Sequence, residues 1–545
     1  MKSLMLVLLI IKYVAGSAVS REGPLVSTPK GQIRGVRAED GDYDGYYGIP
    51  YALVDEDNPF GPSTPYPDFE DIFDADTDGV HCIQASNSPV TGVIQCLQLN
   101  VYVPNSPQSN EPKAVMVFIH GGAFLVGHKS ELSPRFLLKQ DVIIVSINYR
   151  LGLHGFLCSS RPGFKNAGLK DQVLAFQWVK DNIAAFGGDA DKVTIFGMSA
   201  GAMSLDYHLH ATENLAQRAI LMSGTAMTTW TLAEENDYMP IDIAIELGFS
   251  GDDVIEAIEF LSRVDPVEAV EAANRLHYLA DEEGYPVAMP CVERDSDSGI
   301  LTDYPVNLQP KVKGMDIMIG TANKEVMFMY PNADNLHFYR TYSFNRELMY
   351  EFHEAHDVDI VRQFYIGDEQ PNESLQDAIL DYASDVSFVH SAERTVDKYL
   401  NAEANSVYKY LFSYEGERNF VKVLFGLTAS GACHADDLGY VFDPPEFAGM
   451  PVTETDQRVI DAMTKMWTDF AKYGNPTPQP TDSIPEWRPV DEVQRPYMNI
   501  GNPIRAESRV FSDRMAFWDL YYELHGDKVR GYGSGEYRQF VEGGH

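Results

Sequence analysis

Val-Thr-Ile-Phe-Gly-Met-Ser-Ala-Gly-Ala-Met-Ser, at residues 193–204, is the stretch that decides the fold of this chain. A short, largely β-branched run leads into the pattern G-x-S-x-G, in which Gly197 and Gly201 flank Ser199, and small residues follow. This order predicts a strand, a tight turn and a helix, with the serine in a strained backbone conformation and its hydroxyl exposed. Glycine is required on both sides because a Cβ atom would collide with the neighbouring strand or helix backbone. The helix N-terminus adds a positive partial charge where an oxyanion would form, so we interpret Ser199 as a nucleophile.

The segments around this stretch alternate between strands and helices. Apolar or alternating runs predict strands, and a helical periodicity that stops at Gly187-Gly188 predicts a helix. The expected strands are residues 97–103, 114–119, 141–148, 193–196, 219–222, 316–319 and 407–412, with an edge hairpin at 25–28 and 32–36. The expected helices are residues 168–186, 455–472 and 508–523, and residues 230–310 are helical and acidic, without strands. This rhythm predicts an α/β fold: a large, mostly parallel sheet covered by helices on both faces, with helical insertions over its carboxyl edge.

Composition limits the possible partners. The chain has 545 residues, and a hydrophobic content of 44% is ample for the core of one large α/β domain. Its 80 acidic and 42 basic residues give a net charge of −38, which would repel nucleic acid and anionic lipid surfaces. We therefore expect neither as a partner, and we expect the acidic residues 55–78 to form a solvated loop.

The N-terminus has the pattern of a secretory signal. Lys2 supplies a positive charge, residues 4–11 form an apolar core too short to span a bilayer, and residues 15–18 are small. No later stretch is long and apolar enough to cross a membrane. We expect a signal peptide at residues 1–18, a single mature domain at 19–545, and a secreted, extracellular protein. Asn372 lies in the one usable glycosylation sequon, Asn-Glu-Ser.

The five cysteines fit an oxidising compartment only if some of them pair. We expect Cys82 and Cys96 to pair, which closes a loop worth about 3 kcal/mol in the chain-entropy model. Cys158, Cys291 and Cys433 remain, and at least one of these three is expected to be a buried free thiol.

A serine nucleophile needs a base within hydrogen-bond reach and a third group that orients the base. In this type of fold the order along the chain is serine, acid, histidine. His434, in a turn of small residues beyond a predicted strand, is our candidate for the base. His208 and His210 follow Ser199 on the same helix and point away from it, so we interpret them as surface or packing residues.

Glu325 is the candidate acid, because it follows the strand at residues 316–319 directly and could hold the imidazole tautomer. Spacing alone would favour a loop carboxylate in solvent. Asp436 and Asp437 compete for the same role, but both lie too close in sequence to His434 to reach its Nδ1 easily. We expect no metal site, because no histidine pair has ligand spacing with a third partner.

The oxyanion hole should come from the loop after an earlier strand. His120-Gly121-Gly122-Ala123-Phe124 follows the strand at residues 114–119 and fits this position. Its glycines let backbone amides face a carbonyl oxygen without an intervening side chain. The donors that we propose are the N–H groups of Gly122, Ala123 and Ala200.

With these parts placed, the whole mature chain resembles the type-B carboxylesterase and cholinesterase family of α/β-hydrolases. Further matching stretches are Gly48-Ile49-Pro50-Tyr51-Ala52, Leu99-Asn100-Val101-Tyr102, Asn148-Tyr149-Arg150-Leu151-Gly152, Asn166-Ala167-Gly168-Leu169, Asp171-Gln172, and residues 182–189. The resemblance implies a catalytic triad of Ser199, Glu325 and His434 and a structural bridge between Cys82 and Cys96. It also implies that Ser223 lies behind the triad. Among members, the chain looks most like secreted insect esterases of the antennal and odorant-degrading types.

Several positions depart from the family pattern. Met198 stands where the residue before the nucleophile is usually Glu, and Ala123 replaces the third glycine of the oxyanion loop, where its methyl group should narrow the acyl side. Ile94-Gln95 replaces two acidic residues, which puts the usual ion pair to an arginine in doubt. The loop between Cys82 and Cys96 contains no aromatic residue, so choline esters are not expected as preferred substrates.

The resulting expectation is a secreted serine carboxylic-ester hydrolase that cleaves neutral, hydrophobic esters through an acyl-enzyme, without a cofactor. Its partner is a small-molecule ester, and it is expected to be a monomer or a weak homo-oligomer. The alternatives are an enzyme like juvenile hormone esterases, a scavenger with slow turnover, and a non-catalytic binding relative.

Overall fold

The computed structural model describes residues 23–531, apart from positions 86–88, 106–110, 214, 281–286, 295–298, 331, 333 and 492. The signal peptide expected at residues 1–18 therefore lies outside the described residues.

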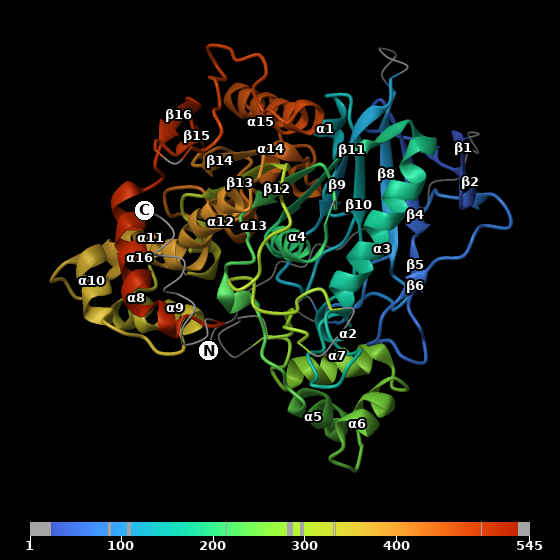
Figure 1. Ribbon diagram of the computed structural model, residues 1–545, viewed down its shortest axis with the longest axis horizontal. Helices are drawn as coiled ribbons and strands as arrows, with labels where there is room; N and C mark the ends of the chain where they lie inside the picture. The colour runs from blue at the N-terminus through green and yellow to red at the C-terminus, as the bar shows by residue number, and fades with distance from the viewer. Residues whose placement is uncertain are drawn as a thin grey trace.

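A mixed sheet of 11 strands forms the centre of the molecule, in the order β16-β15-β14-β13-β12-β11-β9-β10-β8-β4-β3 (Figure 1). The strands between β10 and β15 in this order run parallel, whereas β8, β4, β3 and β16 pair antiparallel at the two sides. The strands are β3 (Val36–Arg37), β4 (Tyr43–Pro50), β8 (Gln98–Pro104), β9 (Lys113–Ile119), β10 (Ile143–Ile147), β11 (Gly188–Met198), β12 (Arg218–Met222), β13 (Asp316–Ala322), β14 (Ser406–Phe412), β15 (Pro496–Ile500) and β16 (Arg505–Ser508). The predicted α/β class is confirmed, because the central strands are parallel and buried along their length.

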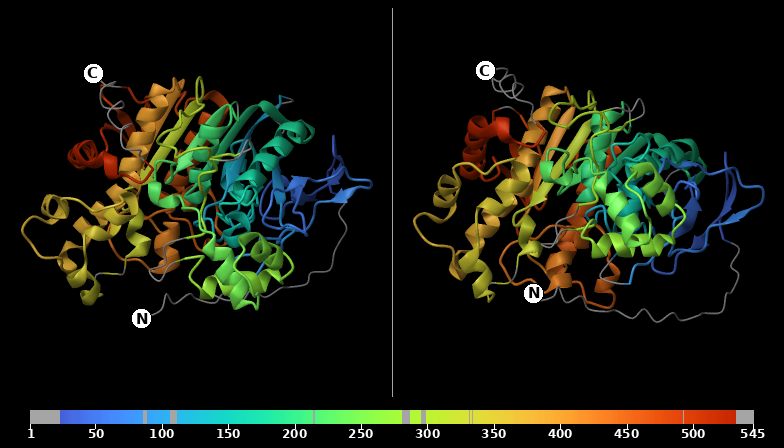
Figure 2. Two further views of the ribbon diagram at one scale, coloured as in Figure 1. Left: turned by 60° about the horizontal axis from the view of Figure 1, so that its bottom comes forward. Right: turned by 90° about the horizontal axis from the view of Figure 1, so that it is seen from below.

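Helices cover this sheet on both sides (Figure 2). The helix α3 (Ala167–Asn182) packs with α4 (Ala200–Ala211), the helix that follows Ser199. Gln172 of α3 donates to the hydroxyl of Ser204 and accepts from His208 Nε2. The helix α1 (Arg135–Leu138) packs with α15 (Glu454–Tyr473), and both pairs contact the sheet. Gly187 takes φ 82° after the short helix η1 (Ile183–Phe186), which confirms the predicted helix stop.

Two groups of helices extend from the sheet on one side of the molecule (Figure 1). The first, α5 (Tyr238–Glu246), α6 (Val254–Leu261) and α7 (Pro266–Arg275), is the predicted insertion and has its own apolar core. Asp253 and Asp265 cap α6 and α7 through their side chains, so these helices begin where the sequence supplies an N-cap. The second group comprises α8 (Leu336–Thr341), α9 (Asn345–Glu351), α10 (Val358–Ile366), α11 (Gln376–Ser384), a π-helical turn at Asp385–Val389 and α12 (His390–Asn401).

Some expectations were wrong or incomplete. The N-terminal hairpin, β1 (Leu25–Thr28) and β2 (Gly31–Arg34), pairs with β7 (Phe73–Asp74) in a separate sheet and is not an edge of the main one. The helix expected at 508–523 begins later, as α16 (Ser512–His525). The acidic segment 55–78 is mostly exposed, but Asp78 binds the buried ammonium group of Lys129 at 2.8 Å.

Among the residues that the structure describes, none of the helices combines the length and the apolar character needed to cross a membrane.

Candidate active site

Ser199 lies at the sharp turn between β11 and α4, with φ 56° and ψ −127°. This conformation is strained for a residue with a side chain, and the Ser199 N–H anchors it by donating to the carbonyl of Met222 at 2.9 Å. Steric clashes explain why the residues on either side of Ser199 are glycines. A Cβ atom on Gly197 would lie 2.4 Å from the backbone of Gly201, and one on Gly201 would lie 2.1 Å from the carbonyl oxygen of Ile119. The sequence therefore folds here into a turn that only glycine can flank.

Glu325 and His434 form a buried pair at the carboxyl edge of the same sheet. Glu325 opens the short helix η3 (Glu325–Met329), three residues after β13, and its side chain is fully buried. Its Oε1 accepts the N–H of Ala322 at 2.7 Å, while Oε2 lies 2.6 Å from His434 Nδ1. The backbone N–H of His434 also donates to the carbonyl of Glu325 at 3.1 Å. The carboxylate therefore holds the proton on Nδ1, which leaves Nε2 as an acceptor.

Two aromatic rings fix the plane of this imidazole. Phe328 stacks on His434 with ring centroids 5.4 Å apart, and Phe388 lies at 4.9 Å on a tilted plane. Phe388 comes from the π-helical turn Asp385–Val389, a type of turn that is frequent at functional sites. Sequence reasoning missed both rings. Phe328 follows Glu325 by three residues and could have been found from that spacing, whereas no local signal indicates Phe388.

The competing carboxylates have other partners. Asp436 Oδ2 accepts the N–H of Cys433 at 2.6 Å, and Asp437 Oδ2 accepts the hydroxyl of Tyr410 at 3.0 Å. Burial is the largest cause that raises the pKa of Asp436 to about 6 and that of Asp437 to about 7. Both therefore support the turn around His434 and do not orient its imidazole.

The loop at residues 121–124 packs directly against Ser199. A Cβ atom on Gly121 would lie 2.7 Å from the carbonyl of Met198 and 3.0 Å from the Cβ of Ser199. Gly122 and Ala123 both have positive φ, 105° and 56°, which turns their amides away from the regular strand direction. Within the part of the chain that the structure describes, the backbone hydrogen bonds include none donated by Gly122, Ala123 or Ala200. Three free N–H groups in one loop–helix corner can bind an oxyanion.

His120 holds this loop through a hydrogen bond to its backbone and a stacking contact with Tyr149. It is buried, and burial lowers its pKa to about 3, so the imidazole is neutral. Its Nδ1 donates to the carbonyl of Gly121 at 2.8 Å, and its ring stacks on Tyr149 at 4.5 Å. The Tyr149 hydroxyl in turn donates to the carbonyl of His120 at 2.9 Å. These contacts of His120 and Tyr149 hold the start of the loop in place.

Ser223 is buried behind the turn that carries Ser199, called the nucleophile elbow, and has φ 51°. It donates its N–H to the carbonyl of Gly320 at 2.9 Å. Its Oγ has no hydrogen-bond partner among the described residues. The neighbouring Gly224 touches the elbow, since a Cβ atom there would lie 2.4 Å from the carbonyl oxygen of Ser199.

His208 and His210 are not on the surface of α4, which corrects that part of the expectation. Both are buried, and α3 covers His208, whose Nε2 lies 2.8 Å from Gln172 Oε1. His210 Nδ1 donates to the carbonyl of Asp206 at 2.9 Å. Both are packing residues, as the alternative interpretation held.

The structure forms the expected Cys82–Cys96 disulfide and a second one, Cys158–Cys291, which the sequence left open. Cys433 is a buried free thiol, as predicted for one of the three remaining cysteines.

Gln95, which replaces an acidic residue of the family pattern, forms hydrogen bonds with the backbone of Val54. The guanidinium of Arg150 pairs with Asp171 at 2.7 Å.

The described residues contain no group of three or more His, Cys, Asp or Glu side chains that could hold a metal ion. Asn372 is half-buried and caps the short helix η4 (Glu373–Leu375), where its Oδ1 accepts the N–H of Ser374 at 2.9 Å.

The model of the carboxylesterase family matches residues 22–518, which is most of the chain. The chain belongs to the carboxylesterase family. It is 31% identical to Esterase FE4 of Myzus persicae, over 82% of this chain and 83% of that protein. It is 30% identical to a juvenile hormone esterase of Tribolium castaneum over 86% of each chain. A protein of Bombus ignitus named carboxylic ester hydrolase is 26% identical over 96% of this chain and 98% of its own length. The resemblance seen in the sequence is therefore confirmed, and the protein is a carboxylic ester hydrolase.

Proposed function

We propose that this carboxylesterase is a secreted serine hydrolase that cleaves neutral, hydrophobic esters through an acyl-enzyme at Ser199. The observation that carries the proposal is the 2.6 Å contact between Glu325 Oε2 and His434 Nδ1, at the edge of the sheet where Ser199 follows β11 with positive φ. A strained, anchored serine and an oriented imidazole are the two requirements for activating a hydroxyl nucleophile.

The mechanism follows from these positions. His434 Nε2 takes the Ser199 proton as Oγ attacks the ester carbonyl, and Glu325 stabilises the imidazolium that forms. The N–H groups of Gly122, Ala123 and Ala200 bind the oxyanion. The imidazolium then protonates the leaving alcohol. In deacylation, the second half of the reaction, His434 removes a proton from a water molecule as the water attacks the acyl carbonyl. The carboxylic acid and free Ser199 are then released.

The surroundings of Ser199 favour an uncharged substrate. Met198 is a buried, apolar residue where the family usually has a carboxylate, so no anionic group precedes the nucleophile. The rings of Phe328 and Phe388 form an apolar wall beside His434. Such a surface gains from burying apolar ester groups and would leave a charged group without compensation.

The two disulfides support an extracellular location, because such bonds persist in oxidising compartments. Together with the signal pattern at residues 1–18, they are the basis for proposing secretion of residues 19–545 as one domain. Asn372 would then be available for glycosylation. We further propose a monomer or weak homo-oligomer and an odorant-degrading role, with a juvenile hormone esterase-like role as the alternative.

A second candidate is a stoichiometric scavenger of reactive esters with slow turnover. The residue that favours it is Ala123, which stands where the family has a third glycine, because its methyl group narrows the acyl side of the oxyanion loop and would slow deacylation.

The test is rapid-mixing kinetics with p-nitrophenyl acetate at about pH 8, comparing the protein with its Ser199→Ala variant. Sustained turnover that the substitution removes by several orders of magnitude supports the esterase. A burst of one equivalent without turnover supports the scavenger. Activity that survives in the variant would overturn the assignment of Ser199.

A further inference from the structure

The loop at residues 121–127 carries the proposed oxyanion donors Gly122 and Ala123, and a glutamine side chain holds its end. The N–H of Gly127 donates to Gln84 Oε1 at 2.9 Å, and Gln84 Nε2 donates to the carbonyl of Gly127 at 3.1 Å. One side-chain amide thus satisfies both backbone polar groups of Gly127. Gln84 is only 7% exposed, so water has little access to replace these two bonds.

Gln84 is itself fixed by the disulfide loop, residues 82–96, whose ends are joined by the Cys82–Cys96 bond. Its backbone N–H donates to the carbonyl of Thr91 at 2.9 Å, and its carbonyl accepts the N–H of Thr91 at 3.1 Å. Its Nε2 also donates to the carbonyl of Cys82 at 3.0 Å. A reversed amide would place Oε1 against two carbonyl oxygens, so these partners determine which way the amide points.

The peptide unit between Val126 and Gly127 connects Gln84 to an oxyanion donor. Gly127 contributes the N–H that Gln84 accepts, and the carbonyl of Val126 belongs to the same planar unit. That carbonyl packs against Gly122, since a Cβ atom on Gly122 would lie 2.0 Å from its oxygen. The N–H of Val126 also donates to the carbonyl of Gly122 at 3.0 Å. A rotation of this peptide unit would therefore displace Gly122.

The end of the loop also meets its beginning. Gly127 has φ 115°, and a Cβ atom there would lie 2.8 Å from the carbonyl oxygen of Gly121. In the middle of the loop, the carbonyl of Phe124 accepts the N–H of Gly152 at 2.7 Å. The loop is thus held at several points, and Gln84 supplies the hold at its end.

We propose that Gln84 is a positioning residue for the oxyanion hole: it fixes the Val126–Gly127 peptide and thereby directs the N–H of Gly122 at the developing oxyanion. Donors that are already in place stabilise an oxyanion well, because nothing has to reorganise as the charge forms. Without the Gln84 amide, the buried N–H and carbonyl of Gly127 lose their partners, and the peptide turns to find others. This inference rests on the proposed function, because it takes Ser199 as the nucleophile and Gly122 as a donor.

The test compares Gln84→Met, which removes both hydrogen bonds, with Gln95→Met. Gln95 lies in the same disulfide loop and also binds both backbone groups of one residue, Val54, at 2.8 and 3.2 Å. Val54 does not belong to the oxyanion loop, so Gln95→Met is the matched control. Gln84→Asn, whose amide is one methylene too short to reach Gly127, serves if Gln84→Met misfolds.

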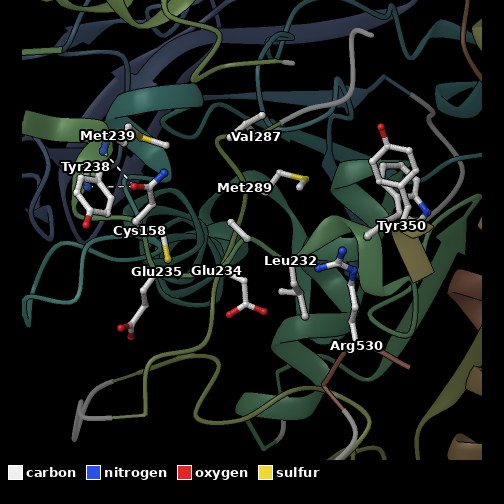
Figure 3. Close-up of a pocket in the computed structure, with 13 residues that line it drawn as sticks. Cys158, Leu232, Glu234, Glu235, Tyr238, Met239, Val287, Met289, Tyr350 and Arg530 are labelled. Atoms are coloured by element: carbon white, nitrogen blue, oxygen red, sulfur yellow. Dashed lines mark hydrogen bonds between the residues drawn. The ribbon is translucent and has the colours of Figure 1, made fainter. Parts of the chain in front are cut away.

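The first readout separates kcat from KM for p-nitrophenyl acetate. Figure 3 shows a pocket of about 540 Å³ whose lining includes Trp230 and Val287, and the described residues that line it include neither Gln84 nor Gly127. A substitution at Gln84 therefore leaves that pocket unchanged. We expect Gln84→Met to lower kcat about 10–100-fold, less than the loss of a donor outright, and to keep KM within about threefold. Gln95→Met should keep the native kcat.

The second readout is inhibition by 1,1,1-trifluorooctan-2-one compared with octan-2-one. Ser199 Oγ adds to the trifluoro ketone carbonyl, its proton passes to His434, and the electron pair of the broken π bond becomes an oxyanion. Octan-2-one forms no stable adduct and reports binding without an oxyanion. Gln84→Met should weaken inhibition by the trifluoro ketone at least about tenfold and change that by octan-2-one by less than about twofold. Equal weakening of both would overturn the proposal.

Native kcat and native inhibition in a folded Gln84→Met or Gln84→Asn protein would also overturn it. So would an equal loss in Gln95→Met, or failure of both Gln84 variants to fold, because Gln84 would then serve the fold and not the oxyanion hole. Ser199→Ala, measured in parallel, separates this proposal from the proposed function. Activity that survives in Ser199→Ala overturns the proposed function, whereas its loss beside unchanged Gln84 variants overturns only the positioning role.

Discussion

Replacing Glu325 with Gln tests whether the carboxylate sets the tautomer of His434. In the native protein both oxygens of Glu325 accept hydrogen bonds, from the N–H of Ala322 at 2.7 Å and from His434 Nδ1 at 2.6 Å. The Glu325→Gln side chain keeps the first of these but directs its NH₂ group at Nδ1. The imidazole must then present a lone pair at Nδ1 and carry its proton on Nε2, where it cannot accept the Ser199 proton.

This wrong tautomer should lower kcat by about 10³–10⁴-fold, the size of the effect when the acid of a serine-protease triad is made an amide. That factor corresponds to about 4–5.5 kcal/mol in the activation barrier. The side chain is fully buried, so solvent cannot replace the lost charge. Steady-state hydrolysis of p-nitrophenyl acetate at pH 8 measures the loss directly.

Glu347→Gln is the matched control. Glu347 is also buried and accepts hydrogen bonds from the hydroxyls of Tyr330 and Tyr342, but it is not a member of the triad. Both variants should lose about 1–3 kcal/mol of stability, because each alters a buried hydrogen-bonded carboxyl. Only Glu325→Gln should lose activity. Retention of more than a tenth of native kcat in that variant would refute the reasoning.

Three further variants have defined outcomes. Burial raises the pKa of Glu131 to about 7, so the folded state binds its proton more tightly than the unfolded chain and native stability falls as the pH rises from about 4.5 to 7. Glu131→Gln should therefore gain up to about 3 kcal/mol at pH 8 and little at pH 4.5 in denaturant titrations, and equal gains at both would contradict this. Gly201→Ala should lose at least about 100-fold in kcat, with a lower melting temperature, because its methyl group would lie 2.1 Å from the Ile119 carbonyl; near-native kinetics would show that the elbow can relax. Cys158→Ala with Cys291→Ala opens a link across 133 residues and should lower stability by up to about 5 kcal/mol in the chain-entropy model, which differential scanning calorimetry against a Cys433→Ala control can measure.

Local features of the fold were predictable because a few adjacent residues encode them. The strand, turn and helix around Ser199 follow from apolar residues and glycines within a dozen positions. The same holds for the helix stop at Gly187, which needs only a residue that tolerates positive φ. The position of Glu325 also follows locally, since a residue just after a parallel strand must lie at the carboxyl edge of the sheet.

Features that depend on distant neighbours were not predictable. The strand β16 (Arg505–Ser508) is largely exposed and polar, and only its pairing with β15 makes it a strand. Helical periodicity placed His208 on α4 but could not reveal that α3 covers that face. The pairing of Cys158 with Cys291 joins segments 133 residues apart, and cysteine counting alone cannot determine such connectivity.

The candidate site also has parts that adjacent residues encode and parts that depend on distant residues. The G-x-S-x-G pattern and the oxyanion loop are contiguous motifs, so their residues could be named in advance. Phe388 could not, because its contact with His434 arises from the π-helical turn Asp385–Val389, which no local sequence pattern indicates. Selectivity is therefore the part of the function that the sequence pattern leaves undetermined.

The most direct test of the account is the covalent labelling of Ser199 by an uncharged fluorophosphonate ester. Intact-mass measurement should show one adduct per chain, formed in parallel with the loss of esterase activity, and peptide mapping should place it on Ser199. The Glu325→Gln variant should react at least 100-fold more slowly, because the same imidazole activates the serine. An adduct on any other residue, or full inhibition without modification of Ser199, would contradict the account.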